Sequence, residues 1–275
     1  HRDLHSFPTR RSSDLFHAGT YCDNPYLVME YVEGMRLTSY VKERNIDRKG
    51  RMQLLVDVAR AVHYAHSMGI IHRDIKPSNI MVRNEGSPVL MDFGIARMLQ
   101  DQEKRLTQTG ELMGSPNYMS PEQLESRKKE IDERADIYGL GAVMYQLLTD
   151  RPPFEEGSLI ELICQVACVP PVPPRKWVPD LPEALEEICM TCLEKSKENR
   201  YASAEILVSK ISRYLEGKDE GFGKSYIRRK NIRAAQRYYH INKRKFFGAV
   251  LAMGSIIGLS FFGWHWSVWE KEAQE

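Results

Sequence analysis

The sequence predicts an α+β fold that is mostly helical and is followed by a single transmembrane helix. Short β-prone runs occur only within the first hundred residues, and helical periodicity dominates after Pro121. A stretch of 19 residues without a charged side chain, 246–264, lies near the end of the chain. With 42% hydrophobic and 28% charged residues, the chain can bury a sizeable core, which excludes a wholly disordered protein.

Residues 1–15 differ from everything that follows, because they are polar and show no periodicity. The string HRDLHSFPTRRSSDL matches, codon by codon, an in-frame translation of a common sequencing-library adapter. Segments of such origin are excluded from reasoning about a fold. We therefore expect the natural sequence to begin near Phe16, and we treat the His-Arg-Asp string at residues 1–3 as a coincidence.

Three short strands are expected. An apolar run covers residues 26–32 and ends at Glu33-Gly34, and two further runs, 80–82 and 89–91, flank a turn with the sequence Asn-Glu-Gly-Ser. Helices are expected where apolar residues recur at helical spacing, and Gly69 is expected to end the second of them. The expected helices cover residues 37–43, 51–68, 135–148, 158–166, 181–193 and 203–215.

The five cysteines are an odd number with no signal peptide ahead of them, which indicates a reducing compartment. The spacing of Cys164 and Cys168, and of Cys189 and Cys192, superficially suggests a zinc site. All four lie in apolar, helix-periodic stretches, where cysteine behaves as a small buried hydrophobic residue. We therefore expect them to pack in the core rather than to bind a metal.

A set of motifs carries the chemistry. His72-Arg-Asp-Ile-Lys-Pro-Ser-Asn79 fits H-R-D-x-K-x-x-N, and it is followed by Asp92-Phe-Gly94, Ser120-Pro-Glu122, Asp136-Ile-Tyr-Gly-Leu-Gly141 and Arg200. In this order and context the chain resembles the eukaryotic-like (Hanks-type) serine/threonine protein kinases. The resemblance covers residues 16–217. It implies a two-lobed kinase fold, represented here mostly by the helical C-terminal lobe.

The resemblance implies a role for each motif residue. Asp74 would accept the proton of the substrate hydroxyl, and Lys76 would place a cation beside the transferring phosphoryl group. Asn79 and Asp92 would supply oxygen ligands to Mg²⁺, so the implied cofactors are ATP and Mg²⁺. A lysine at position 76 accompanies serine/threonine specificity in this family, so the implied substrates are proteins with Ser or Thr.

The nucleotide site is implied only in part. Met29 falls at the gatekeeper position, and the backbone of Glu30 and Val32 would bond adenine, although a plain core strand explains the same apolar run. The Gly-rich loop, the strand lysine and the helix glutamate that hold ATP in the family do not precede Phe16. We therefore expect a truncated N-terminal lobe, and little or no activity from the chain as written.

Structural supports are implied as well. Glu122 and Arg200 would form a buried ion pair that anchors the activation segment, and Asp136 would brace the backbone of the catalytic loop.

The Arg73 guanidinium beside the catalytic aspartate implies control by phosphorylation of the activation segment. Thr107 and Thr109 are the candidate phosphorylation sites, and solvated loop threonines are the alternative.

Residues 246–264 are expected to span a membrane, since 19 helical residues cover about 29 Å. Three tryptophans lie at the far end. The segment 218–245 lies on the near side, and its part from Lys224 to Lys245 carries nine Lys and Arg and no Asp or Glu. By the positive-inside rule the kinase domain is cytoplasmic and residues 265–275 lie outside. A buried helix of a soluble domain is the alternative.

The formal net charge of +2 conceals an asymmetry. Subtracting the +9 of Lys224–Lys245 and the +1 of residues 1–15 leaves −8 for the rest of the chain. Beside a membrane span, the basic segment is expected to meet anionic lipid rather than nucleic acid. Gly254-x3-Gly258 permits close approach of two spans, which leaves a homodimer open.

These features together predict a fragment of a membrane-anchored bacterial Ser/Thr protein kinase that acts in transmembrane signalling. One alternative is a pseudokinase scaffold that works by binding proteins. Another is an aminoglycoside-type phosphotransferase, which is disfavoured by Ser120-Pro-Glu122 and by the stretch 114–119, similar to the peptide-docking segment of protein kinases.

Overall fold

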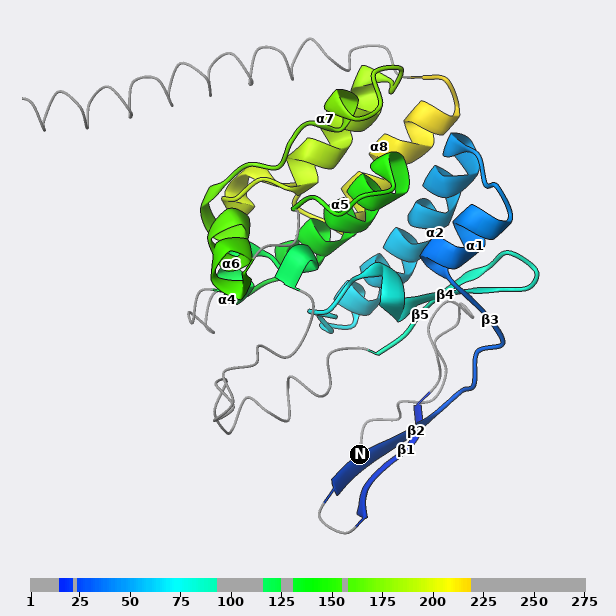
Figure 1. The fold of residues 1–275 in the computed structure, drawn as a ribbon. Helices are drawn as coiled ribbons and strands as arrows, with labels where there is room; N and C mark the ends of the chain where they lie inside the picture. The colour runs from blue at the N-terminus through cyan, green and yellow to red at the C-terminus, as the bar shows by residue number, and fades with distance from the viewer. Residues whose placement is uncertain (1–14, 22–23, 93–115, 125–130, 155–157, 219–275) are drawn as a thin grey trace, which may run out of the picture. The chain divides into compact units, whose positions relative to one another are not determined.

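The computed structural model describes residues 15–21, 24–92, 116–124, 131–154 and 158–218 (Figure 1). The expected transmembrane segment, nearly all of the basic segment before it and nearly all of residues 1–15 lie outside these ranges. Among the helices of the described ranges, none combines the length and the apolar character that crossing a bilayer requires.

Within the described ranges, five short strands form two antiparallel sheets. Strands β1 (Leu15–Tyr21) and β2 (Asn24–Met29) pair with each other. Strands β3 (Gly34–Arg36), β4 (Ile80–Arg83) and β5 (Pro88–Leu90) form the second sheet in the order β3-β4-β5. The sequence did not predict β1 or β3. Gly34, expected to end a strand, instead begins β3, where a Cβ atom would lie 2.2 Å from the carbonyl oxygen of Val82.

All six expected helices are confirmed; α1 has the predicted ends, and the ends of the other five are shifted. The α2 helix begins at Arg48 rather than Arg51, because Asp47 caps it by accepting a hydrogen bond from the Gly50 amide at 2.8 Å. Gly69, with φ of 74°, follows the end of α2 as expected. The helices are α1 (Leu37–Glu43), α2 (Arg48–Ser67), α4 (Pro121–Leu124), α5 (Arg134–Thr149), α6 (Leu159–Cys168), α7 (Glu183–Cys192) and α8 (Ala204–Leu215).

The α5 helix is the centre of the helical region. Nearly all of its residues are buried, and it packs against α2 and α7, while α8 packs along α2 (Figure 1). Two glycines allow close approach on α5. A Cβ at Gly141 would lie 2.4 Å from Cβ of Cys192, and one at Gly139 would lie 2.9 Å from Cβ of Ile75 in the catalytic loop.

The cysteine prediction was half right. Cys189 and Cys192 on α7 are buried, but Cys164 and Cys168 on α6 are exposed. Helical periodicity located α6 correctly, but it does not show whether an apolar face is covered by a neighbour. Within the described ranges, no group of three or more His, Cys, Asp or Glu is placed to hold a metal ion.

Candidate active site

The catalytic loop runs from the end of α2 to a 3-10 turn at Pro77–Asn79, and the first residue of its motif is fully buried. Asp136, from the first turn of α5, holds this loop through its backbone. Its Oδ2 accepts a hydrogen bond from the amide of His72, and its Oδ1 accepts one from the amide of Arg73, each at 2.8 Å. Asp136 therefore has the geometry of the brace that the sequence predicts.

Two histidines complete this support. Nε2 of His66, on α2, lies 2.8 Å from Oδ2 of Asp136. Nε2 of His72 lies 3.0 Å from the carbonyl oxygen of Met91, while its Nδ1 accepts a hydrogen bond from the amide of Asp74 at 3.2 Å. This pattern requires a neutral ring, and burial lowers the pKa of His72. His66 was not predicted as a support, since nothing in its local sequence pattern distinguishes it from other helix residues.

Asp74 is held by the two residues that the motif pairs with it. Its Oδ2 lies 2.8 Å from Nζ of Lys76 and accepts a hydrogen bond from Nδ2 of Asn79 at 2.9 Å. The same Nδ2 also donates to the backbone carbonyl of Asp74 at 2.9 Å. The carboxylate is therefore fixed from two sides, and the three polar ends meet at one point.

Asp92 lies close in space to this group because β5 leads into it. The amide of Met91 donates to the carbonyl of Asn79 at 2.8 Å, which joins the segment before Asp92 to the catalytic turn. Asp92 is exposed and has a φ of 54°, unusual for a residue other than glycine. The amide oxygen of Asn79 and the carboxylate of Asp92 are hard oxygen ligands, so the residues present fit Mg²⁺.

The implied adenine site also falls partly in the described chain. Met29 is half-buried at the end of β2, and Val32 is buried. The carboxylate of Glu30 pairs with Arg83 of β4 at 2.7 Å, which ties this stretch to the second sheet. The candidate phosphorylation sites Thr107 and Thr109 lie outside the described residues.

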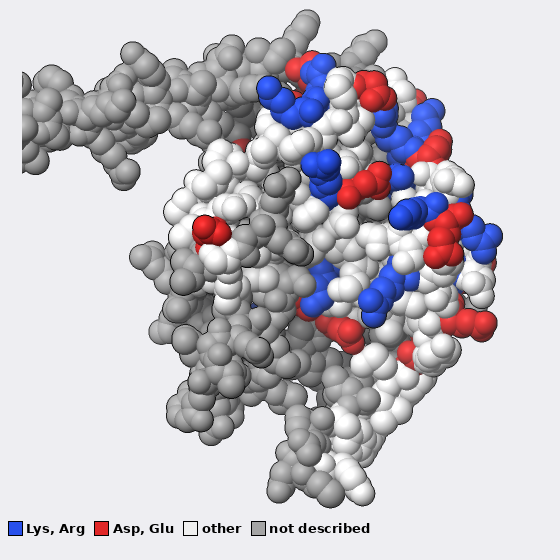
Figure 2. Space-filling view, in the orientation of Figure 1, with Lys and Arg blue, Asp and Glu red and all other residues white. Residues whose placement is uncertain are grey.

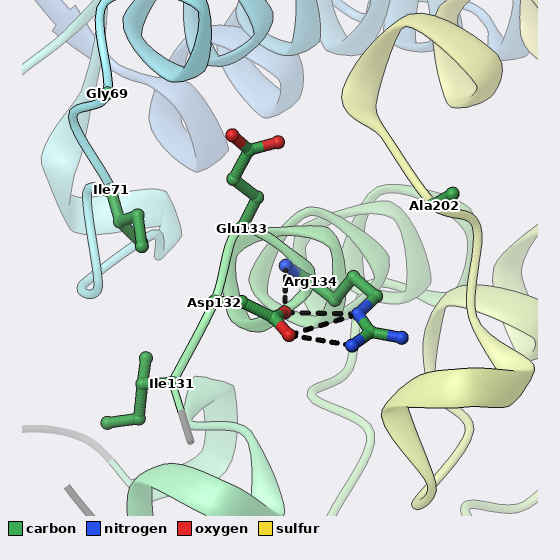
Figure 3. A pocket seen from close by; sticks show the side chains of 7 residues that line it. All are labelled: Gly69, Ile71, Ile131, Asp132, Glu133, Arg134 and Ala202. Carbon is green, nitrogen blue, oxygen red and sulfur yellow. Dashed lines mark hydrogen bonds and ion pairs between the residues drawn. The ribbon is translucent and has the colours of Figure 1, made fainter. Parts of the chain in front are cut away.

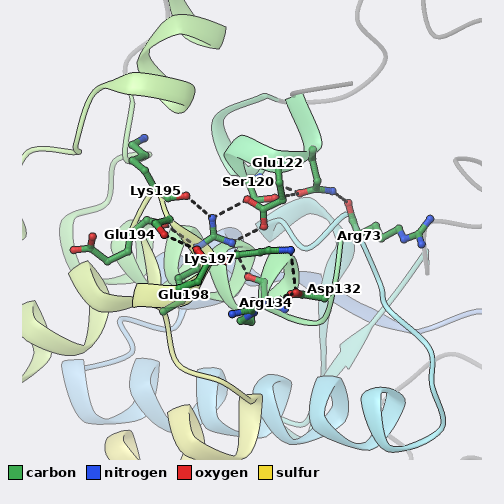
Figure 4. Close-up of polar contacts among 12 residues, drawn as sticks. Arg73, Ser120, Glu122, Asp132, Arg134, Glu194, Lys195, Lys197 and Glu198 are labelled. Atoms are coloured by element: carbon green, nitrogen blue, oxygen red, sulfur yellow. Dashed lines mark hydrogen bonds and ion pairs between the residues drawn. The ribbon is translucent and has the colours of Figure 1, made fainter. Parts of the chain in front are cut away.

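The expected anchor between Glu122, labelled in Figure 4, and Arg200 is present. The two carboxylate oxygens accept from the two terminal nitrogens of the guanidinium at 2.6 and 2.8 Å, and the arginine side chain is fully buried. The guanidinium also donates to the backbone carbonyls of Arg134, Glu194 and Lys195 at 2.7–3.1 Å. With five hydrogen bonds, this buried charge is well satisfied.

Beside that anchor, Gln123 forms a contact that the sequence analysis missed. Its Nε2 donates to the carbonyl of Arg73 at 2.6 Å, so α4 reaches the catalytic loop directly. One feature of the sequence could have indicated this contact. Ser120 stands where alanine is more usual in the motif, and its hydroxyl donates a hydrogen bond to the Gln123 side chain.

A cavity of about 390 Å³ is separate from these motifs (Figure 3). Its walls include Gly69, Ile71, Ala202 and residues 131–134, where Asp132 and Arg134 pair at 2.7 Å. The Arg134 and Lys197 side chains hold the pKa of Asp132 below its usual range, although partial burial opposes them. None of the cavity residues belongs to the catalytic motif, so we assign no ligand to it.

The face shown in Figure 2 carries positive and negative side chains intermixed over the described helices. No large area of a single sign stands out there, so this face offers no pattern typical of nucleic-acid binding.

An aspartate fixed by a lysine and an asparagine, braced from a central helix and flanked by an Arg–Glu anchor, defines the catalytic part of a protein kinase domain. The model of the protein kinase domain family matches residues 12–211. The chain therefore belongs to the protein kinase family, as its resemblance to the Hanks-type kinases predicted.

Two similar relatives are bacterial proteins. The chain is 41% identical over 194 residues to a probable serine/threonine-protein kinase PknB of Bifidobacterium longum, covering 70% of this chain and 28% of that protein. It is 38% identical over 194 residues to the serine/threonine-protein kinase PknB of Mycolicibacterium smegmatis, covering 70% of this chain and 31% of the relative. The chain thus spans about three-tenths of the length of the curated relatives it matches.

Proposed function

We propose that the protein to which this chain belongs transfers the γ-phosphate of ATP to Ser and Thr hydroxyls of protein substrates. The observation that carries this proposal is the fixed carboxylate of Asp74, bonded to both Lys76 and Asn79. The names of the bacterial relatives, which are serine/threonine-protein kinases, support the choice of substrate.

Each residue then has a defined task. Asp74 orients the substrate hydroxyl and takes its proton, while Lys76 balances the negative charge of the transferring phosphoryl group. Asn79 and Asp92 hold Mg²⁺, which, when bound, neutralises the phosphate oxygens of ATP. Met29 lines the adenine site, and the backbone of Glu30 and Val32 bonds the base. Phosphorylation of Thr107 or Thr109 gives the Arg73 guanidinium an anionic partner.

The rest of the chain supports a proposal for the cellular location of this kinase. Residues 246–264 form a single membrane span, with the kinase domain in the cytoplasm and residues 265–275 outside. The basic segment 218–245 contacts anionic lipid, and the spans associate as a homodimer through Gly254 and Gly258. The protein then carries a signal across the membrane. Without a Gly-rich loop and its lysine, residues 1–275 by themselves show no autophosphorylation.

The decisive test uses the full-length protein that contains this chain. Asp74→Asn should lower phosphate transfer from labelled ATP to generic protein substrates by about 100-fold or more, because it removes the proton acceptor. Asp180→Asn is the matched control, since the Asp180 side chain is 74% exposed and pairs with Arg48 at the surface at 2.7 Å; this variant should leave the rate unchanged. Equal, measurable rates for wild type and Asp74→Asn would end the catalytic assignment, whereas no transfer by either protein would favour the pseudokinase scaffold.

A further inference from the structure

We infer that Gln123, oriented by Ser120, is a positioning residue for phosphate transfer. It holds the carbonyl of Arg73, the group that immediately precedes the catalytic Asp74, and so fixes the direction in which the carboxylate points. The inference rests on the proposed kinase function, and it extends that function to a residue outside the motif assignments.

The orientation of the Gln123 amide is determined by its neighbours Ser120 and Arg73, both of which are labelled in Figure 4. Its Oε1 accepts a hydrogen bond from the amide of Ser120 at 2.9 Å and from the Ser120 hydroxyl at 3.0 Å. An amide oxygen only accepts, so two donors at one end force the NH₂ group to the other end. That NH₂ group meets the Arg73 carbonyl at 2.6 Å. Ser120 is fully buried, so water does not compete for its hydroxyl.

Arg73 has a backbone conformation that needs such support. Its φ is 65°, in the left-handed region that residues with a Cβ atom rarely adopt. Strained residues persist where surrounding contacts over-determine them. Here Oδ1 of Asp136 accepts from the Arg73 amide at 2.8 Å, and Gln123 donates to the Arg73 carbonyl, so the backbone is held at both ends.

The carbonyl of Arg73 belongs to the same peptide plane as the amide of Asp74, which donates to Nδ1 of His72 at 3.2 Å. Gln123 and His72 therefore fix one rigid plane from opposite edges. Loss of the Gln123 contact would let this plane rotate and would tilt the Asp74 side chain away from its partners. Small misplacements of catalytic groups lower rates strongly.

The same four-residue helix carries a second anchor. Glu122, next to Gln123 on α4, pairs with the buried Arg200. Docking of α4 through that ion pair brings the Gln123 amide to the catalytic loop. This arrangement also accounts for the serine at position 120, because alanine would supply only one of the two donors that orient the Gln123 amide.

The test compares variants of the full-length protein. Gln123→Leu removes the amide and keeps a side chain of similar size, and it should lower kcat by about 10- to 100-fold while leaving KM for ATP within about twofold. Ser120→Ala should lower kcat by only about two- to threefold, because the Ser120 amide still orients Gln123. The matched control is Gln53→Leu, since Gln53 is exposed on α2, and its kcat should equal that of the wild type.

A double variant separates positioning from general damage. If Ser120 acts through Gln123, Ser120→Ala should have no further effect in the Gln123→Leu background. Additive losses would overturn the inference, as would an unchanged kcat in Gln123→Leu.

A measurement on the catalytic loop itself keeps the inference independent of activity. Gln123→Leu should speed hydrogen exchange at the amides of residues 72–74, whereas Gln53→Leu should not. An unchanged exchange rate would overturn the inference even in an active kinase. A wild type that transfers no phosphate would overturn the proposed function. The exchange result would then test only whether Gln123 holds the catalytic loop.

Discussion

The α5 helix and the β1–β2 pair are built from similar proportions of apolar residues, yet they are stabilised very differently. Fourteen residues of α5 are buried between α2 and α7. In the β1–β2 pair, Phe16, Tyr21, Tyr26 and Val28 are 40–75% exposed, and within the described residues these strands pair only with each other. A two-stranded ribbon alone is marginally stable in water. The catalytic residues depend on the first region, which carries Asp136, and not on the second.

Breaking the anchor of the helical region should have the largest effect. Arg200→Met would leave the Glu122 carboxylate and three backbone carbonyls in a buried site without their cation. Removing one partner of a buried ion pair costs about 3–5 kcal/mol. We expect that loss in the free energy of unfolding, measured by urea titration followed by far-UV circular dichroism.

The control for this prediction is Arg134→Met. Arg134 pairs with Asp132, but the two side chains are 28% and 39% exposed. Partly exposed pairs contribute about 0–1 kcal/mol. A loss from Arg134→Met as large as that from Arg200→Met would show that burial does not set the strength of these ion pairs.

Close packing around α5 provides the second prediction. In Gly141→Ala the new methyl group would lie 2.4 Å from Cβ of Cys192, which cannot move without shifting α7. Overpacking of this kind costs about 1–3 kcal/mol. Ser209→Ala should change stability by less than about 1 kcal/mol, because Ser209 is exposed on α8 and the substitution adds no atom to a packed contact. Thermal melts of both variants would contradict the prediction if they coincided.

The sequence predicted this helical region well for a physical reason. Long helices such as α2 and α5 repeat the same apolar spacing over several turns, so their pattern is strong. The strands β1 and β3 were missed because β3 has three residues and β1 begins within a stretch that was excluded from the prediction. The exposure of Cys164 was also missed, since it depends on the neighbours of α6 rather than on its sequence.

The candidate site shows the same difference between residues that a local pattern predicts and residues whose contacts depend on the fold. Asp74, Lys76 and Asn79 were predicted because they lie within eight residues of one motif and contact one another. Gln123 was missed because its partner, Arg73, is 50 residues away in the sequence. The contact between Glu122 and Arg200 spans 78 residues and was predicted only because the family resemblance supplies that pair. Gln123 lies outside those motif assignments, and a distant contact of this kind leaves no local periodicity in the sequence.

The third prediction concerns pH. Burial lowers the pKa of His72 below 6.5, and the charges of Asp136, Asp74 and Asp92 oppose this shift without overcoming it. The unfolded chain therefore binds a proton that the folded chain does not bind. Stability is fully present above about pH 6.5 and is lost as the pH falls through that value, by at most about 1.4 kcal/mol per pH unit.

The measurement is the slope of unfolding free energy between pH 7.5 and 5. His72→Gln should flatten this slope, whatever its effect on stability at pH 7.5. Gln53→Leu is the control, because Gln53 is exposed on α2 and has no titratable group, so this variant should leave the slope unchanged. An unaltered slope in His72→Gln would mean that the buried imidazole is protonated in the folded chain.

The smallest effect is expected in the β1–β2 pair. A substitution there is the sharpest test of the contrast between the buried α5 helix and this exposed pair of strands. Tyr21 is 75% exposed at the end of β1, so Tyr21→Ser removes little buried surface. Surface substitutions of this kind change stability by about 0.5 kcal/mol or less. A loss above 1 kcal/mol in urea titrations would contradict the contrast between the two regions, because it would require Tyr21 to be packed in solution. An unchanged midpoint would mean that the helical region holds its stability without help from the exposed face of the ribbon.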